Sequence, residues 1–454
     1  MEKYLIEQLG NFFFELSFEK LPRGVIEKAK ACLFNSLAAT IGGYDIDLSK
    51  KAINLVKRID GGKGVSTILV DGAKVSSFNA AFANSTMSCS RTQNDTHFQT
   101  VAHIGEVVPH VCLAIGEEKK VNGRDFLTAL VAGYEVMARI GKGGVPFTIH
   151  RGFRSTSVFG TFGACAAAAK LMGLSKEKYV NALGYAANFS SGLLECWHGG
   201  TPEYAFQAGV SSQNGMMAVL IAEEGGTSAK TTLEGEKGFY NAFAGSQKGI
   251  HAVLDGLGEK YEILEVIFKK FPGELFNQPV METFLALIKE HRLTEKQIKK
   301  IRVRMDPVAA KYPGVNNVGP FQTYLDALVS CPFVIGMLGV YQRIAFEKYA
   351  DYKNRRILEI CKKVEVEEEQ GRPPMSCYME IHLTNGKRIS KDLGLSQNSY
   401  RWSLDETAAF FQEISSPLLG ESNVIRLLEE IRNLEKVKDI SKLGKLLSRP
   451  SVAK

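Results

Sequence analysis

The stretch 157-SVFGTFGACAAAAKLMGLS-175 decides the fold class. It is long enough for a helix of about five turns, and small residues dominate it. Because Gly160, Gly163 and the alanines project little or no side chain, other helices can approach this backbone closely. A helix of this composition is typical of the centre of a helical bundle.

Helical patterns continue on both sides of this stretch, as far as about residue 265. Apolar residues recur at three- and four-residue spacing in 25-VIEKAKACLFNSLAATIG-42, and Gly42-Gly43 is suited to cap the end of that helix. The segments 106-EVVPHVCLAIGEE-118 and 123-GRDFLTALVAGYEVMARIG-141 follow the same pattern. Residues 1–266 are therefore predicted to form a helical domain.

The pattern changes beyond residue 265. The segment 299-KKIRVRMDP-307 alternates like a half-buried strand, and 377-CYMEIHLTNGKRIS-390 predicts two strands joined by Asn385-Gly386, a strong hairpin signal. Helical segments are expected at 280–292, before the first strand, and at 323–348, between the strand segments. Residues 267–402 are therefore predicted to form a smaller α+β domain.

The end of the chain returns to a helical pattern, from Leu404 through 423-NVIRLLEEIRNLEKV-437. We therefore predict a mainly α fold, in which a large helical-bundle domain is followed by the α+β domain. That second domain is inserted before a C-terminal helical return, residues 403–454, which is expected to pack back on the helical domain.

Length and composition agree with a globular protein of two domains. The 454 residues are too many for one compact core. Lysine and arginine exceed aspartate and glutamate by seven, 56 against 49, but the basic residues are scattered and do not form a stripe with aromatic residues. We therefore expect an anionic small molecule as the partner, and no nucleic acid.

The sequence also predicts a location. No run of about eighteen uncharged apolar residues occurs, so no membrane partner is expected. The N-terminal MEKYLIEQLGNFFFELSFEKL lacks the basic start and the apolar core of a signal peptide. The eight cysteines include no C-x-x-C motif and are expected to be reduced thiols, which favours a cytoplasmic protein.

A polar cluster, Arg91, Asp95, His97 and His103, precedes an apolar run. The spacing D-x-H-x5-H matches no common zinc pattern, so no metal is predicted. The cluster suits acid/base chemistry, because histidine exchanges protons near neutral pH and an arginine can hold an anion. A structural interpretation is also open, in which Asp95 or Thr96 caps the following helix and His103 is a satisfied polar group.

Three further segments are candidates for binding a ligand. In 150-HRGFRSTSVFGTFG-163, arginines precede a helix start, where free N–H groups attract anions. The glycines of 192-GLLECWHGGTPEYAFQAGVSSQNG-215 favour a tight loop near a ligand. The lysines of 268-FKKFPGELFNQP-279 lie close to the predicted boundary, and clefts between domains often bind small ligands. The first of these segments is also consistent with a solvated basic loop, the second with a loop near another chain, and the third with an ordinary pair of exposed lysines.

Taken together, these segments resemble the MmgE/PrpD family over nearly the whole chain. The family includes 2-methylcitrate dehydratase, cis-aconitate decarboxylase and iminodisuccinate epimerase. The resemblance rests on six segments in the family's order: LAATIGG, NDTHFQTVAHIGEVVPHVCLAIGEE, RGFRSTSVFGTFGACAAAAKLMGL, QAGVSSQNGMMAVLIAEEGGTS, LEGEKGFYNAF and KKFP. It implies homodimers, an active site in the cleft between the domains, and lyase or isomerase chemistry, without a cofactor, on a di- or tricarboxylate.

The resemblance also assigns residues. The family's aspartate and histidine fall on Asp95 and His103, its Thr-His pair on Thr96 and His97, and its lysine before an aromatic residue and proline on Lys270. The chain departs from the family pattern at five positions. A histidine is replaced by Arg154, a lysine by Tyr204, two further histidines by Gln207 and Gln278, and an acidic residue by Thr92. The substrate is therefore expected to differ from those of the best-known members.

Removal of a proton next to a carboxylate needs a base, an acid and cations that offset the developing charge. We predict His103 as the acid/base residue, Asp95 as its partner, and Arg154 and Lys270 as an anion clamp. Tyr204 is a further candidate proton donor, and the remaining substrate-binding candidates are Arg91, Thr96, His97 and Gln207. Two alternatives stay open: a hydrolase or carbon–carbon bond enzyme of the same fold that uses Tyr204, and a ligand-binding homologue without catalysis.

Overall fold

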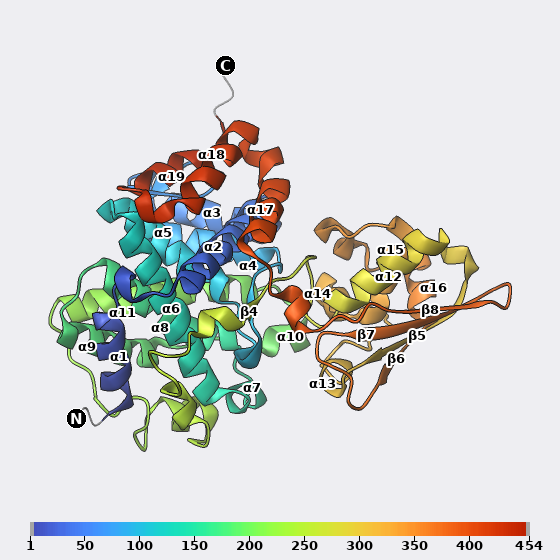
Figure 1. The fold of residues 1–454 in the computed structure, drawn as a ribbon, viewed down its shortest axis with the longest axis horizontal. Helices are drawn as coiled ribbons and strands as arrows, with labels where there is room; N and C mark the ends of the chain where they lie inside the picture. The colour runs from blue at the N-terminus through green and yellow to red at the C-terminus, as the bar shows by residue number, and fades with distance from the viewer. Residues whose placement is uncertain (1–3, 451–454) are drawn as a thin grey trace. The chain divides into compact units, whose positions relative to one another are not determined.

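The computed structural model describes residues 4–450 and consists of two compact units (Figure 1). The first unit contains residues 4–194, 203–266 and 402–450, and the second contains residues 195–202 and 267–401. Residues 1–3, at the start of the predicted helical domain, and residues 451–454, at the end of the predicted C-terminal return, lie outside the described residues.

The first unit is almost entirely helical, which confirms the predicted mainly α fold. Its short strands include β1 (Ser66–Thr67) and β2 (Lys74–Val75), which pair with each other, and β3 (Thr96–His97). Its helices are α1 (Leu5–Glu15), α2 (Arg23–Gly43), α3 (Asp47–Asp60), α4 (Ser77–Ser90), α5 (Val108–Lys119), α6 (Gly123–Gly144), α7 (Phe147–His150), α8 (Ser155–Leu171), α9 (Lys176–Phe189), α11 (Tyr204–Glu223), α17 (Leu404–Leu419), α18 (Glu421–Arg432) and α19 (Ser441–Leu446).

Helix α8 forms the centre of this unit, as its small residues predict. Every residue from Ser155 to Ala169 is buried, and α8 packs against α5, α6, α9 and α11 (Figure 1). A Cβ atom on Gly163 would lie 3.0 Å from the carbonyl oxygen of Gly133 in α6. A side chain at either position would therefore force the two helices apart. This close packing fixes the N-terminal end of α8, where Arg154 lies.

The C-terminal helices return to the first unit, as predicted. Helix α17 packs against α2, and the rings of Phe34 and Phe411 lie 5.3 Å apart. Helix α19 packs against α5. Within residues 4–450, no helix combines the length and the apolar character that crossing a bilayer requires.

The second unit contains a four-stranded sheet in the order β6-β5-β7-β8. Strand β5 (Ile298–Met305) is parallel to β6 (Val364–Glu368) and antiparallel to β7 (Cys377–Leu383). The predicted hairpin is confirmed, because β7 turns at Asn385-Gly386 into β8 (Arg388–Asp392) and Gly386 has a φ of +85°. The helices are α10 (Glu195–Gly199), α12 (Gln278–His291), α13 (Pro307–Ala310), α14 (Tyr324–Val329), α15 (Cys331–Tyr341) and α16 (Arg355–Cys361).

The helical segment predicted at 323–348 is divided into α14, α15 and a 3₁₀ turn at Phe346–Asp351. Pro332 explains the first break, because it has no N–H group and its ring would clash with the preceding turn of a continuous helix. Ser330 instead caps α15 by accepting a hydrogen bond from the Phe333 amide at 3.0 Å. Gln342, in the left-handed conformation with φ +54°, ends α15.

Candidate active site

The loop between α4 and α5, residues 91–107, carries five of the predicted site residues and is largely buried. A buried loop must find partners for its polar groups within the protein. Asn94 Nδ2 donates to Ser88 Oγ at 2.6 Å, and the Ser36 hydroxyl of α2 donates to the Gly105 carbonyl at 2.7 Å. The loop is therefore an ordered part of the core and not a solvated turn.

Asp95 is fully buried, and its carboxylate holds the loop in place. Oδ1 accepts a hydrogen bond from the Gly105 amide at 2.8 Å, and Oδ2 accepts one from the Tyr134 hydroxyl of α6 at 2.6 Å. Asp95 therefore caps the 3₁₀ turn Ile104–Glu106, whereas α5 itself begins without a side-chain cap. Burial raises the pKa of Asp95 to about 6, although the hydrogen bonds from Tyr134 and Gly105 oppose the shift.

His103 is partly exposed, unlike the buried residues around it. Its Nδ1 lies 2.9 Å from the backbone carbonyl oxygen of Asp95 and 3.0 Å from Thr96 Oγ1, and its amide donates to Thr156 Oγ1 at 3.0 Å. A carbonyl oxygen only accepts hydrogen bonds, so Nδ1 carries the hydrogen and Nε2 carries the lone pair in the neutral ring. In the neutral ring, Nε2 is therefore the atom that can accept a proton.

Arg154, the N-cap residue of α8, forms a buried ion pair with Glu106. Its Nη2 donates to Glu106 Oε2 at 2.9 Å, and its Nη1 donates to the Tyr204 carbonyl at 3.1 Å. Burial opposes ionisation of Glu106, but the charges of Arg154 and His103 outweigh it and hold the pKa of Glu106 below its ordinary value. Glu106 is therefore an anion that influences both Arg154 and His103.

Tyr204 and Gln207 lie on the first turn of α11, near Arg154. The Tyr204 side chain is buried, and its ring centroid lies 5.8 Å from the Arg154 guanidinium carbon. Gln207 Oε1 accepts a hydrogen bond from Ser157 Oγ at 2.9 Å, and Nε2 donates to the Leu193 carbonyl at 3.0 Å. The structure thus brings both residues to the N-terminal end of α8.

His97 belongs to a different buried network. Its Nδ1 lies 2.9 Å from Thr100 Oγ1, and its Nε2 lies 3.3 Å from Glu262 Oε2. Lys142 pairs with the other oxygen of Glu262 at 2.7 Å. Burial would raise the pKa of Glu262, but its contacts with His97 and Lys142 lower it to about 2. This charged network ties the loop to α6.

Arg91 joins the end of α4 to the end of α2. Its Nη1 donates to the Gly42 carbonyl at 2.9 Å, and its Nε donates to Gln93 Oε1 at 2.9 Å. An arginine at the C-terminal end of a helix interacts favourably with the carbonyl groups there. These contacts give Arg91 a structural function in the first unit.

Lys270 and Gln278 belong to the second unit. Lys270 pairs with Glu282 at 2.8 Å, and its Nζ lies 5.7 Å from the centroid of the Phe271 ring. Buried Gln278 accepts a hydrogen bond from the Phe271 amide and donates one to the Phe271 carbonyl, each at 3.0 Å. Gln278 therefore braces the loop that carries Lys270.

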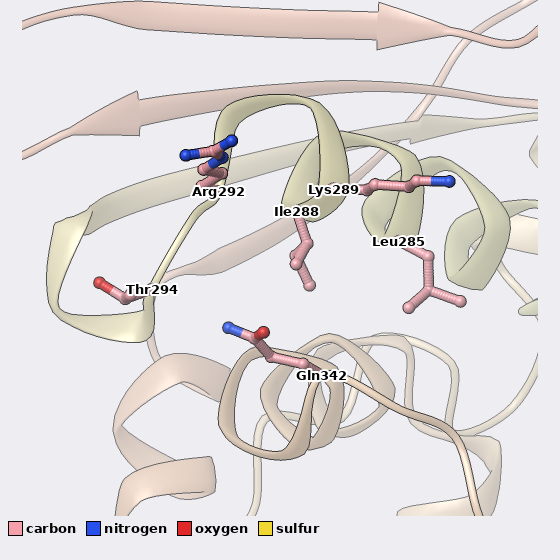
Figure 2. A pocket seen from close by; sticks show the side chains of 6 residues that line it. All are labelled: Leu285, Ile288, Lys289, Arg292, Thr294 and Gln342. Atoms are coloured by element: carbon pink, nitrogen blue, oxygen red, sulfur yellow. The ribbon is translucent and has the colours of Figure 1, made fainter.

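The second unit also contains a pocket of about 640 Å³ between the ends of α12 and α15 (Figure 2). It is lined by Leu285, Ile288, Lys289, Arg292, Thr294 and Gln342. No histidine or carboxylate lines it, so it offers no group that exchanges protons near neutral pH. Among residues 4–450, no group of three or more histidine, cysteine, aspartate or glutamate side chains is arranged to bind a metal ion.

Sequence reasoning missed three residues that the structure places beside the predicted ones: Glu106, Tyr134 and Glu262. Glu106 follows His103 by three residues, a spacing that brings it onto the same 3₁₀ turn. Tyr134 and Glu262 are 39 and 165 residues away from their partners in the loop. No local pattern in the sequence could have linked them to it.

Comparison with known proteins gives matches over both units. The MmgE/PrpD N-terminal domain model matches residues 7–250, and the MmgE/PrpD C-terminal domain model matches residues 271–393. Cis-aconitate decarboxylase of Mus musculus is 25% identical, covering 100% of this chain and 95% of the mouse protein. The Homo sapiens protein of that name is 24% identical, with 99% and 96% covered, and that of Aspergillus terreus is 22% identical, with 96% and 94% covered.

Proposed function

The chain belongs to the MmgE/PrpD family, and from this premise we propose that it is a cofactor-independent lyase or isomerase. Its substrate would be a small di- or tricarboxylate-like acid, and the reaction a dehydration, decarboxylation or epimerisation. Each of these reactions transfers a proton at carbon close to a carboxylate. The names of the relatives support a lyase of this type.

The observation that carries this proposal is the setting of His103. The ring is partly exposed, and the backbone carbonyl of Asp95 fixes the hydrogen on Nδ1. In the proposed reaction, Nε2 removes or delivers the proton at the substrate carbon. The Glu106 carboxylate stabilises the imidazolium that forms when Nε2 accepts the proton.

The other predicted residues complete the proposal. Asp95 positions His103 through the loop, and Thr96 contacts the same ring nitrogen. Arg154 and Lys270 supply positive charge for carboxylates, although the pairing of Arg154 with Glu106 limits the charge that it offers. Tyr204 is a second candidate proton donor.

A ligand-binding homologue without catalysis is the second candidate function. It is favoured by Tyr204 and Gln207, which are neutral where the family pattern has a lysine and a histidine. Such a protein would bind carboxylates but would not transfer their protons. The hydrolase or carbon–carbon bond alternative requires Tyr204 to react, and a Tyr204→Phe variant tests it.

Proton exchange in D₂O tests the proposed function. The protein is incubated with a panel of mono-, di- and tricarboxylates, and deuterium incorporation and product formation are followed by NMR. We expect exchange at a carbon next to a carboxylate in the wild type and its loss in His103→Ala, with exposed His251→Ala as the matched control. Binding without exchange or product would favour the ligand-binding homologue instead.

A homodimer formed through α11 is part of the proposal. Between Tyr204 and Ala222 this helix has no charged residue, and Val210, Met217 and Leu220 on its outer face are 37%, 40% and 39% exposed. An uncharged apolar stripe on an outer face is typical of a protein interface. It suits a second copy in particular, because a two-fold axis would bring the stripe against itself without like-charge repulsion.

A further inference from the structure

The ion pair between Glu106 and Arg154 is sealed from water. The relative exposure of these residues is 2% and 6%, and their charged atoms lie 2.9 Å apart. The guanidinium is further held by the Tyr204 carbonyl and by Ser157 Oγ, at 3.1 and 3.3 Å. Separating such a pair would leave a buried charge without its partner, which is costly. Arg154 therefore has its charge balanced within the protein.

The two carboxylates of the loop, Asp95 and Glu106, each have a cation close by. Asp95 and Glu106 contribute carboxylates, while Arg154 and Lys28 contribute fixed cations. Lys28 is close enough to affect the pKa of Asp95, and its Nζ donates to the Val266 carbonyl at 2.6 Å. Arg154 and Lys28 therefore offer a ligand at His103 little positive charge of their own.

This balance is unfavourable for a ligand with many negative charges. Each additional carboxylate near His103 would lose water without gaining a compensating cation, because Glu106 already neutralises Arg154. The relatives are named for cis-aconitate, an acid with three carboxyl groups. In this chain Tyr204 and Gln207, at the N-terminal end of α8, add no charge that could compensate a third carboxylate.

We propose that Glu106 determines substrate charge and that the substrate of this enzyme carries at most two carboxylates. This inference rests on the proposed function, because it assumes that the substrate binds at His103. Arg154 then serves mainly to hold Glu106 and the start of α11. By neutralising Arg154, Glu106 lowers the affinity of the site for acids with more than two carboxylates.

Titration of the wild-type protein gives the first test. Binding of glutarate, with two carboxylates, and of propane-1,2,3-tricarboxylate is measured by calorimetry under one set of buffer conditions. We expect glutarate to bind at least about tenfold more tightly, because a modest electrostatic cost for one uncompensated carboxylate produces a factor of ten. Equal or tighter binding of the tricarboxylate would overturn the inference, and this result does not depend on the folding of any variant.

The variant Glu106→Gln gives the second test. It keeps the size of the side chain but frees the charge of Arg154, so the affinity for the tricarboxylate should rise about tenfold relative to glutarate. Adding Arg154→Gln should cancel this gain. The matched control is Glu117→Gln, because Glu117 lies on α5 and pairs with Lys74, and its replacement should leave the preference unchanged. A thermal melt shows whether each variant is folded.

The two proposals fail in different ways. If the wild type exchanges substrate protons through His103 but prefers the tricarboxylate, the inference about Glu106 is wrong and the proposed function stands. If no carboxylate exchanges its protons, the proposed function is wrong. The calorimetric preference for glutarate over the tricarboxylate, and its change in Glu106→Gln, would still show whether Glu106 selects ligands by charge. An unchanged preference in a folded Glu106→Gln variant would also overturn the inference.

Discussion

The Nδ1 atom of His103 lies 2.9 Å from the backbone carbonyl oxygen of Asp95, an acceptor that a side-chain substitution does not remove. The Asp95 carboxylate instead binds the Gly105 amide and the Tyr134 hydroxyl. The hydrogen on His103 is therefore fixed by the main chain, while the Asp95 side chain fixes the path of the loop.

A comparison of Asp95→Asn with His103→Ala follows from this arrangement. His103→Ala should lower proton exchange by a factor of about 100 to 10,000, the usual contribution of a general acid–base group. Asp95→Asn should lower it by only about tenfold, because the acceptor for Nδ1 is retained. Rates are measured by deuterium incorporation in both folded variants. Equal losses would show that the Asp95 carboxylate itself takes part in proton transfer.

The stability of the protein should depend on pH through Asp95. Its pKa is about 6 in the folded protein, against an ordinary value of 3.8, so between about pH 4 and 6 the folded state binds more protons than the unfolded state. The free energy of unfolding of the wild type should therefore fall, relative to that of Asp95→Asn, as the pH rises through this window. The expected change is about 3 kcal/mol. Urea denaturation at pH 4, 5, 6 and 7 measures it, and a flat or rising difference would contradict it.

Tyr134→Phe should destabilise the protein by more than a comparable tyrosine substitution elsewhere in the core. The Tyr134 hydroxyl donates to a carboxylate, and its loss should cost about 1.5–3 kcal/mol at pH 7. The control is Tyr179→Phe, because the buried Tyr179 hydroxyl donates to the neutral carbonyl of Ala166 at 3.0 Å and should cost about 1 kcal/mol. Denaturation of both variants at pH 7 gives the comparison, and a smaller effect at Tyr134 would show that Asp95 is supported by other groups.

The sequence was sufficient to predict the fold where the signals are local. The small residues of α8, the Asn385-Gly386 hairpin and the apolar spacing of α2 each have one physical explanation and each matches the structure. The division of 323–348 was missed, because Pro332 and Ser330 interrupt a segment whose other residues from 327 to 341 are all uncharged and mostly apolar. Close approach of helices was also predictable, since only glycine fits where Gly133 and Gly163 meet.

The candidate site was less predictable, because its chemistry depends on distant residues. The cluster from Asp95 to His103 is visible in the sequence, but the acceptor for His103 is a backbone atom, which no sequence pattern reveals. The pairing of Arg154 with Glu106 joins residues 48 positions apart. From the sequence Arg154 therefore resembles an unbalanced cation, and only the folded structure shows that its charge is already compensated.

The outer face of α11 leads to a prediction about assembly. Replacement of Val210 and Met217 by lysine would place like charges on both sides of a two-fold contact, so the double variant should be monomeric at concentrations where the wild type is a dimer. Ile425→Lys is the matched control, because Ile425 on α18 is 57% exposed but its helix carries charged residues along its length. Sedimentation velocity over a concentration series measures the masses. A monomeric wild type, or a double variant that remains dimeric, would show that α11 does not form the interface.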